Sequence, residues 1–202
     1  MHSISHLTRL VVVFLSLYLT GCATHKPNIR SSTEVSQATG VILASVTASN
    51  GGAISYFYRK KGSYEVITLA PNAAPKDDYL KDIKKHGQLV ARDAEPGEYE
   101  LTGWSMFVYG YPSSVTFTPK NPSPISFTIE PGVVTYLGNL HTDVVQGKNI
   151  FRIAIPVDAK PKFGDDSDAD LAHFPTKFPL LAAWPVRKAI LANHIEYAGS
   201  GY

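Results

Sequence analysis

His141 and Asp143 are the pair of residues best suited by type and spacing to acid–base chemistry. They are separated only by Thr142, and side chains two apart in an extended strand point to the same face. A histidine held by a carboxylate is the base and orienting partner of many hydrolases. The other histidines after residue 22 form no HxH or HExxH spacing with His141: His25, His86, His173 and His194. The sequence therefore favours a structural use or plain exposure of the pair, with a hydrolytic enzyme as the alternative.

Three alternating acids, Asp166, Asp168 and Asp170, imitate the start of a calcium-binding loop. An EF-hand loop needs glycine at its sixth position and glutamate at its twelfth, but this chain has Leu171 and Lys177 there. Acidic side chains are also favoured in the first turn of a helix, where they complement the helix dipole. We therefore expect these acids to cap a helix, and we expect neither a metal ion nor a cofactor.

Ser105 lies in Gly103-Trp104-Ser105-Met106-Phe107, the first half of a nucleophile elbow without its closing glycine. The elbow also requires a turn from strand to helix, whereas the residues around Ser105 have the composition of a continuous strand. The sequence contains no glycine-rich phosphate loop. It thus offers no motif for catalysis.

Aromatic side chains are concentrated just before Pro112, and three of them are candidates for ligand binding: Trp104, Tyr109 and Tyr111. Exposed aromatic rings stack on sugars or anchor protein interfaces. Side chains alternate between the faces of a strand, so some of these rings should point outward. The competing interpretation, which the sequence favours, is that the rings are packed beneath helices formed by the C-terminal residues.

Cys22 is the only cysteine, and it follows an apolar run at residues 10–19. Ten helical residues cover about 15 Å, half of a hydrocarbon core of about 30 Å, which indicates a cleaved export signal rather than a permanent span. Leu19-Thr20-Gly21-Cys22 resembles the lipobox of bacterial lipoproteins, in which an apolar residue and two small ones precede the lipidated cysteine. The resemblance implies a signal peptide at 1–21 and membrane attachment through lipid on Cys22. An ordinary secretory signal beside a free cysteine is the alternative.

The residues after Cys22 indicate which membrane the protein is attached to and how the domain is connected to Cys22. In lipoproteins of this kind an aspartate after the cysteine retains the protein at the inner membrane, and this chain has Ala23. The resemblance therefore implies the cell envelope, at an outer membrane facing the periplasm. Residues 22–38 are polar and are interrupted by Pro27, which predicts a lipidated tether without packed structure.

The balance of charge argues against a nucleic-acid partner. The chain has 19 Lys and Arg against 17 Asp and Glu, a formal net charge of +2. Binding to nucleic acid relies on clustered cations that neutralise phosphates. The basic runs are short and lie beside turn residues: Arg59-Lys60-Lys61 and Lys84-Lys85. We expect an envelope protein or a glycan as the partner, together with the membrane.

From residue 39 the sequence changes to short segments rich in Val, Ile, Thr, Tyr and Phe, which is typical of strands joined by turns. Strands are expected at 41–47, 53–59, 64–69, 88–92, 99–108, 114–118, 125–129, 133–140 and 151–157. Alternation is clearest at 125–129 and 151–157, which predicts two core strands. Asn50-Gly51-Gly52 predicts a hairpin between the first two strands. A change of apolar phase at Gly103 predicts a β-bulge.

Two proline-glycine turns, at 96–97 and 131–132, each precede a strand. The run Pro96-Gly97-x-Tyr99-x-Leu101 resembles the entry to a core strand in prealbumin-like and carboxypeptidase-regulatory-like β-sandwiches. Residues 134–138 are similar to a later strand of bacterial lipoproteins with such domains. The resemblance covers about residues 86–158. It implies a mainly β fold, a single antiparallel β-sandwich of prealbumin-like or immunoglobulin-like class at 39–160, and it transfers no catalytic residue.

Residues 161–202 are expected to form a short helical extension packed on the sandwich. A first helix should follow the acids and stop at Pro175. A second should start at Pro185, a favoured first helical position, with an apolar stripe of Val186, Ala189, Ile190 and Asn193. Such helices would cover a sheet edge that could otherwise pair with other chains.

These observations lead to one functional expectation and two alternatives. The lipobox, the strand pattern and the lack of a catalytic motif predict a lipid-anchored envelope protein that serves as a binding or assembly module without catalysis. The first alternative is carbohydrate or peptidoglycan binding through exposed aromatic rings. The second is a hydrolase that uses His141 and Asp143.

Overall fold

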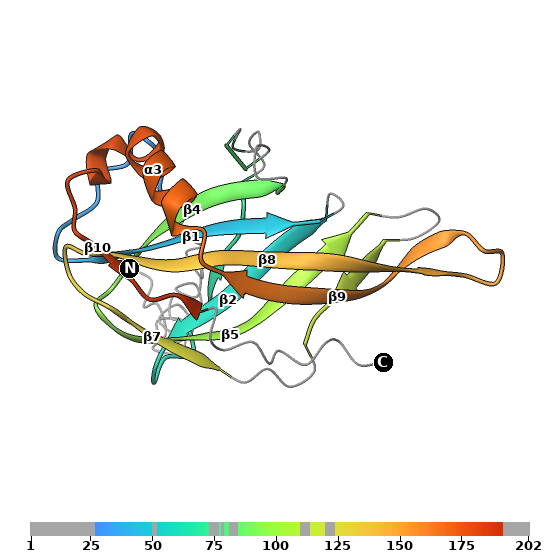
Figure 1. Cartoon of the computed structure of the whole chain (residues 1–202). Helices are drawn as coiled ribbons and strands as arrows, with labels where there is room; N and C mark the ends of the chain where they lie inside the picture. Colours follow the sequence, from blue (N-terminus) through green and yellow to red (C-terminus); the bar gives the residue numbers. More distant parts are fainter. Residues whose placement is uncertain are drawn as a thin grey trace, which may run out of the picture.

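The computed structural model describes residues 27–49, 52–72, 77, 79–80, 85–109, 114–119 and 124–191. Two β-sheets pack face to face on a shared apolar core, which confirms a mainly β, sandwich-like fold (Figure 1). Sheet A contains β1 (Gly40–Ala48), β4 (Gly87–Ala94), β8 (Val134–Lys148), β9 (Ala154–Gly164) and β10 (Val186–Lys188). Sheet B contains β2 (Ala53–Lys60), β3 (Ile67–Leu69), β5 (Gly97–Val108), β6 (Val115–Phe117) and β7 (Ile125–Ile129).

Sheet A is mixed, so the expectation of a purely antiparallel sandwich was wrong. β1 pairs antiparallel with β4 but parallel with β8, where Val41 lies opposite Val134. Every residue of β1 is buried, because this central strand is covered on both faces, as parallel strands usually are. β1 and β2 belong to different sheets, so the expected hairpin between them was also wrong. Residues 50 and 51 of that turn lie outside the described residues.

The core between the sheets follows the alternation expected from the sequence. Ile125, Phe127 and Ile129 of β7 are buried while the residues between them are exposed, which confirms this core strand. The predicted bulge is confirmed, because Phe57 of β2 lies opposite Gly103 whereas Tyr58 lies opposite Leu101. One extra residue of β5 therefore lies between the two pairs, and the inward-facing phase of the strand changes there.

β8 and β9 continue past the end of the sheet as a two-stranded ribbon, residues 144–157, which we call the arm (Figure 1). β1 ends at Ala48, close to Thr142, while β8 continues to Lys148. Six further residues extend the ribbon by about 20 Å. The strand expected at 151–157 was wrong at its start, since β9 begins at Ala154. Phe151 lies in the terminal turn and is 75% exposed.

α3 (Ser167–Lys177) and the short helix η2 (Pro179–Leu181) cover the outer face of sheet A at the end opposite the arm (Figure 1). Phe174, Phe178 and Leu181 pack there in a second apolar cluster with Leu43 and Tyr136. The expected stop at Pro175 was wrong, because α3 continues through it to Lys177. No helix in the described part of the chain is long and apolar enough to cross a bilayer.

The residues after Pro185 form a strand rather than the expected second helix. β10 pairs parallel with β8, with Val186 opposite Val134 and Lys188 opposite Tyr136. β9 pairs with β8 only from Asn139 onward, so the start of β8 has a free edge that β10 fills. Ladder bonds at that edge override the local helical preference. Asn193 lies outside the described residues.

Two residues of the expected tether, Asn28 and Ile29, are buried against the domain, whereas most of residues 30–38 are exposed. Ile29 is buried, and its backbone N–H donates to Ala91 O of β4 at 2.9 Å. Asn28 accepts a hydrogen bond from Arg92 Nη1 at 3.1 Å and donates to Ala70 O at 2.8 Å. The packed domain therefore includes Asn28, eleven positions before the start expected at residue 39.

Candidate functional site

A glycine bulge in β8 decides which side chains reach the outer face of sheet A. Leu43 of β1 lies opposite Tyr136, but Ser45 lies opposite Asn139, so β8 has one residue more than β1 in this interval. Gly138 takes the extra position with a φ of +97°, and a Cβ there would lie 2.4 Å from Gly164 O. Tyr136 and Asn139 therefore share the outer face although they are three residues apart.

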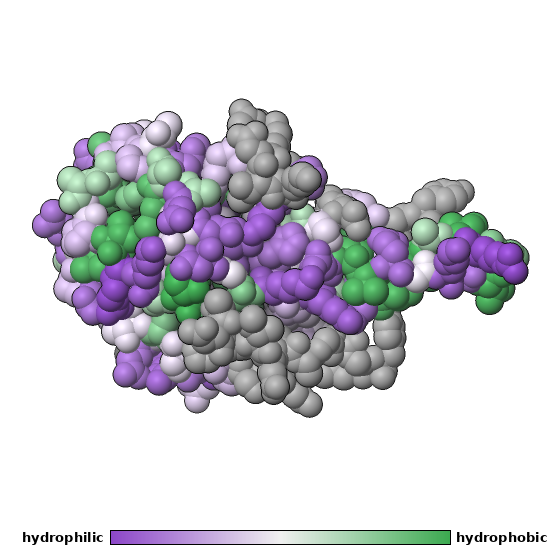
Figure 2. Space-filling view, viewed as in Figure 1, coloured by the Kyte–Doolittle hydropathy of each residue, from purple (hydrophilic) through white to green (hydrophobic). Residues whose placement is uncertain are grey.

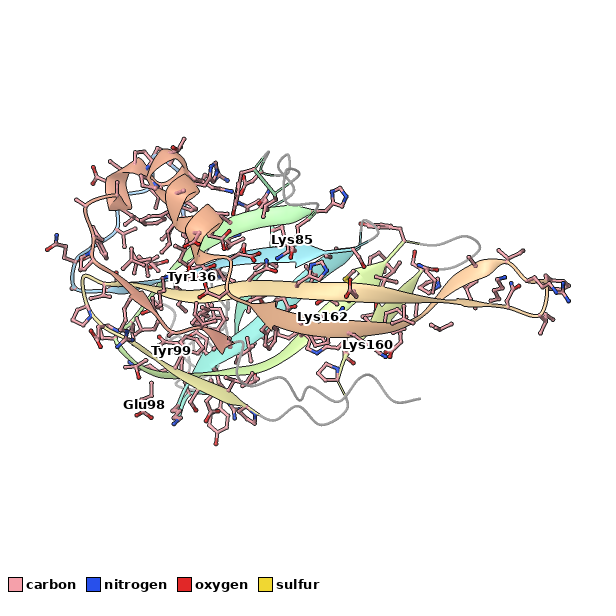
Figure 3. All side chains as sticks on the ribbon, in the orientation of Figure 1. Lys85, Glu98, Tyr99, Tyr136, Lys160 and Lys162 are labelled. Carbon is pink, nitrogen blue, oxygen red and sulfur yellow. The ribbon has the colours of Figure 1, made fainter. Side chains whose placement is uncertain are left out.

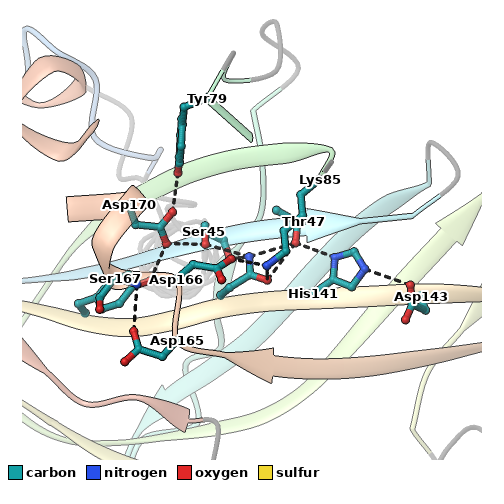
Figure 4. A network of polar contacts seen from close by, with 12 residues as sticks. Ser45, Thr47, Tyr79, Lys85, His141, Asp143, Asp165, Asp166, Ser167 and Asp170 are labelled. Atoms are coloured by element: carbon teal, nitrogen blue, oxygen red, sulfur yellow. Dashed lines mark hydrogen bonds and ion pairs between the residues drawn. The ribbon is translucent and has the colours of Figure 1, made fainter. Parts of the chain in front are cut away.

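Asp170 of α3 is the buried centre of the polar contacts on this face (Figure 4). Its carboxylate accepts hydrogen bonds from Ser45 Oγ at 2.6 Å, Tyr136 Oη at 2.6 Å and Tyr79 Oη at 2.7 Å. Burial raises the pKa of Asp170, although these three hydrogen bonds act in the opposite direction. Burial and the neighbouring Asp170 carboxylate likewise raise the pKa of Tyr79 and of Tyr136.

Asn139 extends the hydrogen-bond network from Ser45 to Thr47 and Lys85. Its Nδ2 donates to Ser45 Oγ at 2.9 Å and to Thr47 Oγ1 at 3.1 Å. Its Oδ1 accepts from Lys85 Nζ at 2.9 Å, and Lys85 also forms an ion pair with Asp166. Lys85 and Asp166 thus tie the residues before β4 to the start of α3 (Figure 4).

His141 and Asp143 lie together at the next positions on the same face, as the sequence indicated. Thr47 Oγ1 is 2.8 Å from His141 Nδ1, and His141 Nε2 is 3.1 Å from Asp143 Oδ1. Burial disfavours the ionised Asp143, but hydrogen bonds from Lys162 and His141 outweigh it and lower the pKa of this carboxyl. An ionised carboxylate only accepts, so His141 Nε2 donates to Asp143, while Nδ1 and the Thr47 hydroxyl share the second hydrogen bond.

The order hydroxyl, imidazole and carboxylate is the order found in hydrolytic triads. Thr47, however, is fully buried, so its hydroxyl cannot reach a substrate at the surface. The contacts of His141 with Thr47 and Asp143 join β1 to β8 instead. The geometry supports a structural role that fixes the outer face of β1 and β8.

The network extends along the sheet from α3 towards the arm. Figure 3 labels Tyr136 near the α3 end of β8 and Lys162 farther along, on β9. Lys162 forms an ion pair of 2.5 Å with Asp143 and lies largely in solvent. No group of three or more His, Cys, Asp or Glu side chains in the described ranges could hold a metal ion.

Sequence reasoning found His141 and Asp143 but missed Asp170 as a network centre. Asp170 was expected to cap a helix, whereas the structure shows no side-chain cap at Asp166 and a bond from Ser167 N to Asp165 Oδ1. The available signal was Gly138, because an isolated glycine within a strand pattern indicates a bulge. Tyr136 and Asp170 are 34 positions apart in the sequence, so no local signal indicated their contact.

The three aromatic candidates are not brought together as a binding surface. Trp104 lies in the core between the sheets and is 1% exposed, so it cannot stack on a sugar. It is buried by sheet A and not, as expected, beneath C-terminal helices. Tyr109 is 73% exposed and contacts Phe107 edge-on, with ring centroids 4.8 Å apart. Tyr111 and the lipidation candidate Cys22 lie outside the described residues.

We predict that Trp104 is inaccessible to quenchers in solution. In a Trp184→Phe variant, Trp104 is the only tryptophan, and its burial should give blue-shifted emission that iodide hardly quenches. The matched Trp104→Phe variant, which retains the partly exposed Trp184, should be quenched more strongly. Equal quenching of the two variants would contradict the burial of Trp104.

A small cavity of about 260 Å³ lies away from this network, between β3 and the end of β4. Its lining includes the cations Lys60 and Arg92 and the acids Glu65, Asp93 and Glu95. Lys60 and Glu95 already form an ion pair of 3.1 Å. With both signs of charge present, the lining does not select a class of ligand.

Comparison with known proteins adds no relative from which a role could be transferred. No protein-family model matches the chain. No curated protein matches it either.

Proposed function

We propose that this chain is a lipid-anchored cell-envelope protein whose β-sandwich is a binding or assembly module without catalysis. One observation carries the proposal: Leu19-Thr20-Gly21-Cys22 ends the apolar run at 10–19 and contains the only cysteine. A lone thiol in an exported protein has no internal disulfide partner, and acylation gives it a use. Ala23 supports the outer membrane, on its periplasmic side, as the destination.

For the finer fold class we propose a prealbumin-like sandwich. In immunoglobulin domains the first two strands share a sheet, whereas β1 and β2 lie in different sheets here. The parallel pairing of β1 with β8 at the centre of sheet A also separates this chain from a sandwich built only of antiparallel hairpins. These two features favour the prealbumin-like class of the two that the sequence suggests.

Because Asn28 is packed against the domain, the segment that connects the domain to Cys22 is short. Six positions separate Cys22 from Asn28, which is a reach of about 20 Å at full extension. A lipid on Cys22 would therefore hold the domain close to the bilayer. Surface features of the domain would then act near the membrane, which suits a module that binds or assembles with other envelope components.

The non-catalytic part of the proposal is supported by the geometry of Thr47 and His141. Thr47 supplies the hydroxyl of the triad-like series, and it is buried where no substrate at the surface can reach it. A glycan partner receives less support, since Trp104 lies in the core. The arm at residues 144–157, in contrast, projects from the sandwich and has an apolar tip.

We predict that Cys22→Ala abolishes membrane attachment. Without the thiol no lipid can be added, so the protein should leave the membrane fraction and lose its acyl mass. Fractionation of cells that express the full chain, followed by mass spectrometry, measures both effects. Ala23→Asp is the matched control, and it should keep the lipid but fractionate with the inner membrane. Retention of Cys22→Ala in membranes at the parent's processed mass would refute the proposal.

A further inference from the structure

The tip of the arm presents three apolar side chains to solvent. Ile150, Phe151 and Ile153 are 91%, 75% and 57% exposed. At the far end of the arm, hydrophobic and hydrophilic surface lie side by side (Figure 2). A two-stranded ribbon is only marginally stable without support on a face or from a partner. An apolar tip on such a ribbon, about 20 Å beyond the sheet, indicates a binding element.

The turn holds these side chains in a fixed arrangement. Asn149 Oδ1 accepts from the backbone N–H groups of Phe151 and Ile153, at 2.9 and 3.0 Å. Arg152 N–H donates to Asn149 O at 2.9 Å. Arg152 has a φ of +61°, in the left-handed region, where a three-residue hairpin loop favours glycine. A cation therefore occupies the one position of the turn whose backbone is strained, and its side chain lies beside the apolar residues of the tip.

The charge of the arm is of one sign. Residues 144–157 contain Lys148 and Arg152 and no acid. Apolar and aromatic side chains flanked by cations are the composition of protein segments that lie in the interface of a bilayer, where the cations meet anionic headgroups. The tip therefore complements an anionic lipid surface both in polarity and in charge.

Two other occupants fit the tip less well. Pairing of β9 with a foreign strand is hindered by Pro156 and Pro161, because proline offers no backbone N–H on an edge strand. A second copy meeting tip to tip would bring Lys148 and Arg152 of both chains together. Three apolar side chains also bury far less than the roughly 800 Å² per partner of a stable protein interface.

We propose that the tip of the arm, residues 148–153, inserts its apolar side chains into the interface of an anionic bilayer. Phe151 and Ile150 enter the acyl boundary while Lys148 and Arg152 bind lipid phosphates. This contact is additional to the lipid on Cys22 and does not depend on it. It gives the proposed module a direct role at the membrane surface.

The test places an environment-sensitive fluorophore at the tip. The full-length chain with Ile150→Cys is labelled with a nitrobenzoxadiazole group and reconstituted into phosphatidylcholine vesicles with or without phosphatidylglycerol. A Tyr64→Cys chain, labelled at an exposed side chain in the connection between β2 and β3, is the matched control. We expect a blue shift and quenching by nitroxide lipids at position 150, more with phosphatidylglycerol, and neither at position 64. Phe151→Ser, and separately Lys148→Gln with Arg152→Gln, should reduce the shift.

Two results would overturn insertion. The first is a tip probe that stays in water on anionic vesicles although flotation shows the chain attached to them. The second is a blue shift that depends on protein concentration and not on lipid, which indicates a second copy. The parent chain, which has no cysteine besides Cys22, tests the anchoring proposal separately. If Cys22 is lipidated, the parent has no free thiol and does not react with the fluorophore. If the parent does react, the anchoring proposal is wrong, and tip insertion is then tested in a Cys22→Ser background.

Discussion

Asp170→Ala is expected to lower the free energy of unfolding by about 3–5 kcal/mol. Three hydroxyl groups, from Ser45, Tyr79 and Tyr136, donate to this fully buried carboxylate. Alanine leaves all three donors buried without their acceptor, and each such loss costs about 1–3 kcal/mol. The mutation also removes the hydrogen bonds that link α3 to Ser45 of β1 and Tyr136 of β8. Chemical denaturation followed by circular dichroism measures the change.

Asp168→Ala is the matched control on the same helix. Asp168 lies in the first turn of α3 but is exposed, so its loss should cost about 0.5 kcal/mol or less. Similar losses for the two variants would contradict the central place of Asp170 in the network.

Because the pKa of Asp170 is raised, the free energy of unfolding should depend on pH through this residue. The folded state binds the proton of Asp170 more tightly than the unfolded state does. The stability that protonation of Asp170 contributes to the folded state is therefore complete below the unfolded pKa of about 3.9. This stability is lost as pH rises through the pKa of Asp170 in the folded state. The parent should lose more stability than Asp170→Asn as pH rises above about 4. Parallel pH profiles for the two proteins would show that Asp170 has no raised pKa.

Gly138→Ala is expected to destabilise the protein by about 3 kcal/mol. A side chain at φ +97° is strained, and its Cβ would lie 2.4 Å from the backbone oxygen of Gly164. Relief requires β8 to move away from β9 or the bulge to slip, and a slip would turn Tyr136 or Asn139 from the outer face. Thermal and chemical denaturation measure the loss.

Gly164→Ala provides the control, because it changes the partner residue in the same close approach. A Cβ at Gly164 meets no atom within 4 Å, so this variant should lose less than about 1 kcal/mol. An equal cost at both glycines would mean that the bulge does not constrain β8 in the way described.

The sequence predicted elements best where alternation and burial coincide. Ile125, Phe127 and Ile129 alternate and point into the core, and the phase change at Gly103 marked the bulge in β5. The same alternation failed at Phe151 and Ile153, because periodicity reports an extended chain but not whether another layer covers it. Length and composition therefore could not distinguish a core strand from a free ribbon.

Contacts that form only in the assembled sheet could not be predicted from local sequence patterns. β10 forms at Val186 because β8 has a free edge there, whereas Pro185 by itself favours a helix. His141 and Asp143 were predicted as a pair from their spacing of two. The contact of Asp170 with Ser45 joins residues 125 apart and requires the position of α3, and the bulge at Gly138 places Tyr136 and Asn139 on the same face.

Attachment through lipid on Cys22 can be measured on the protein extracted from membranes, as the mass of its N-terminal peptide. We predict a peptide that begins at Cys22 and carries the added mass of acyl chains. A peptide with an unmodified Cys22 thiol, or one that still contains residues before Cys22, would contradict the account.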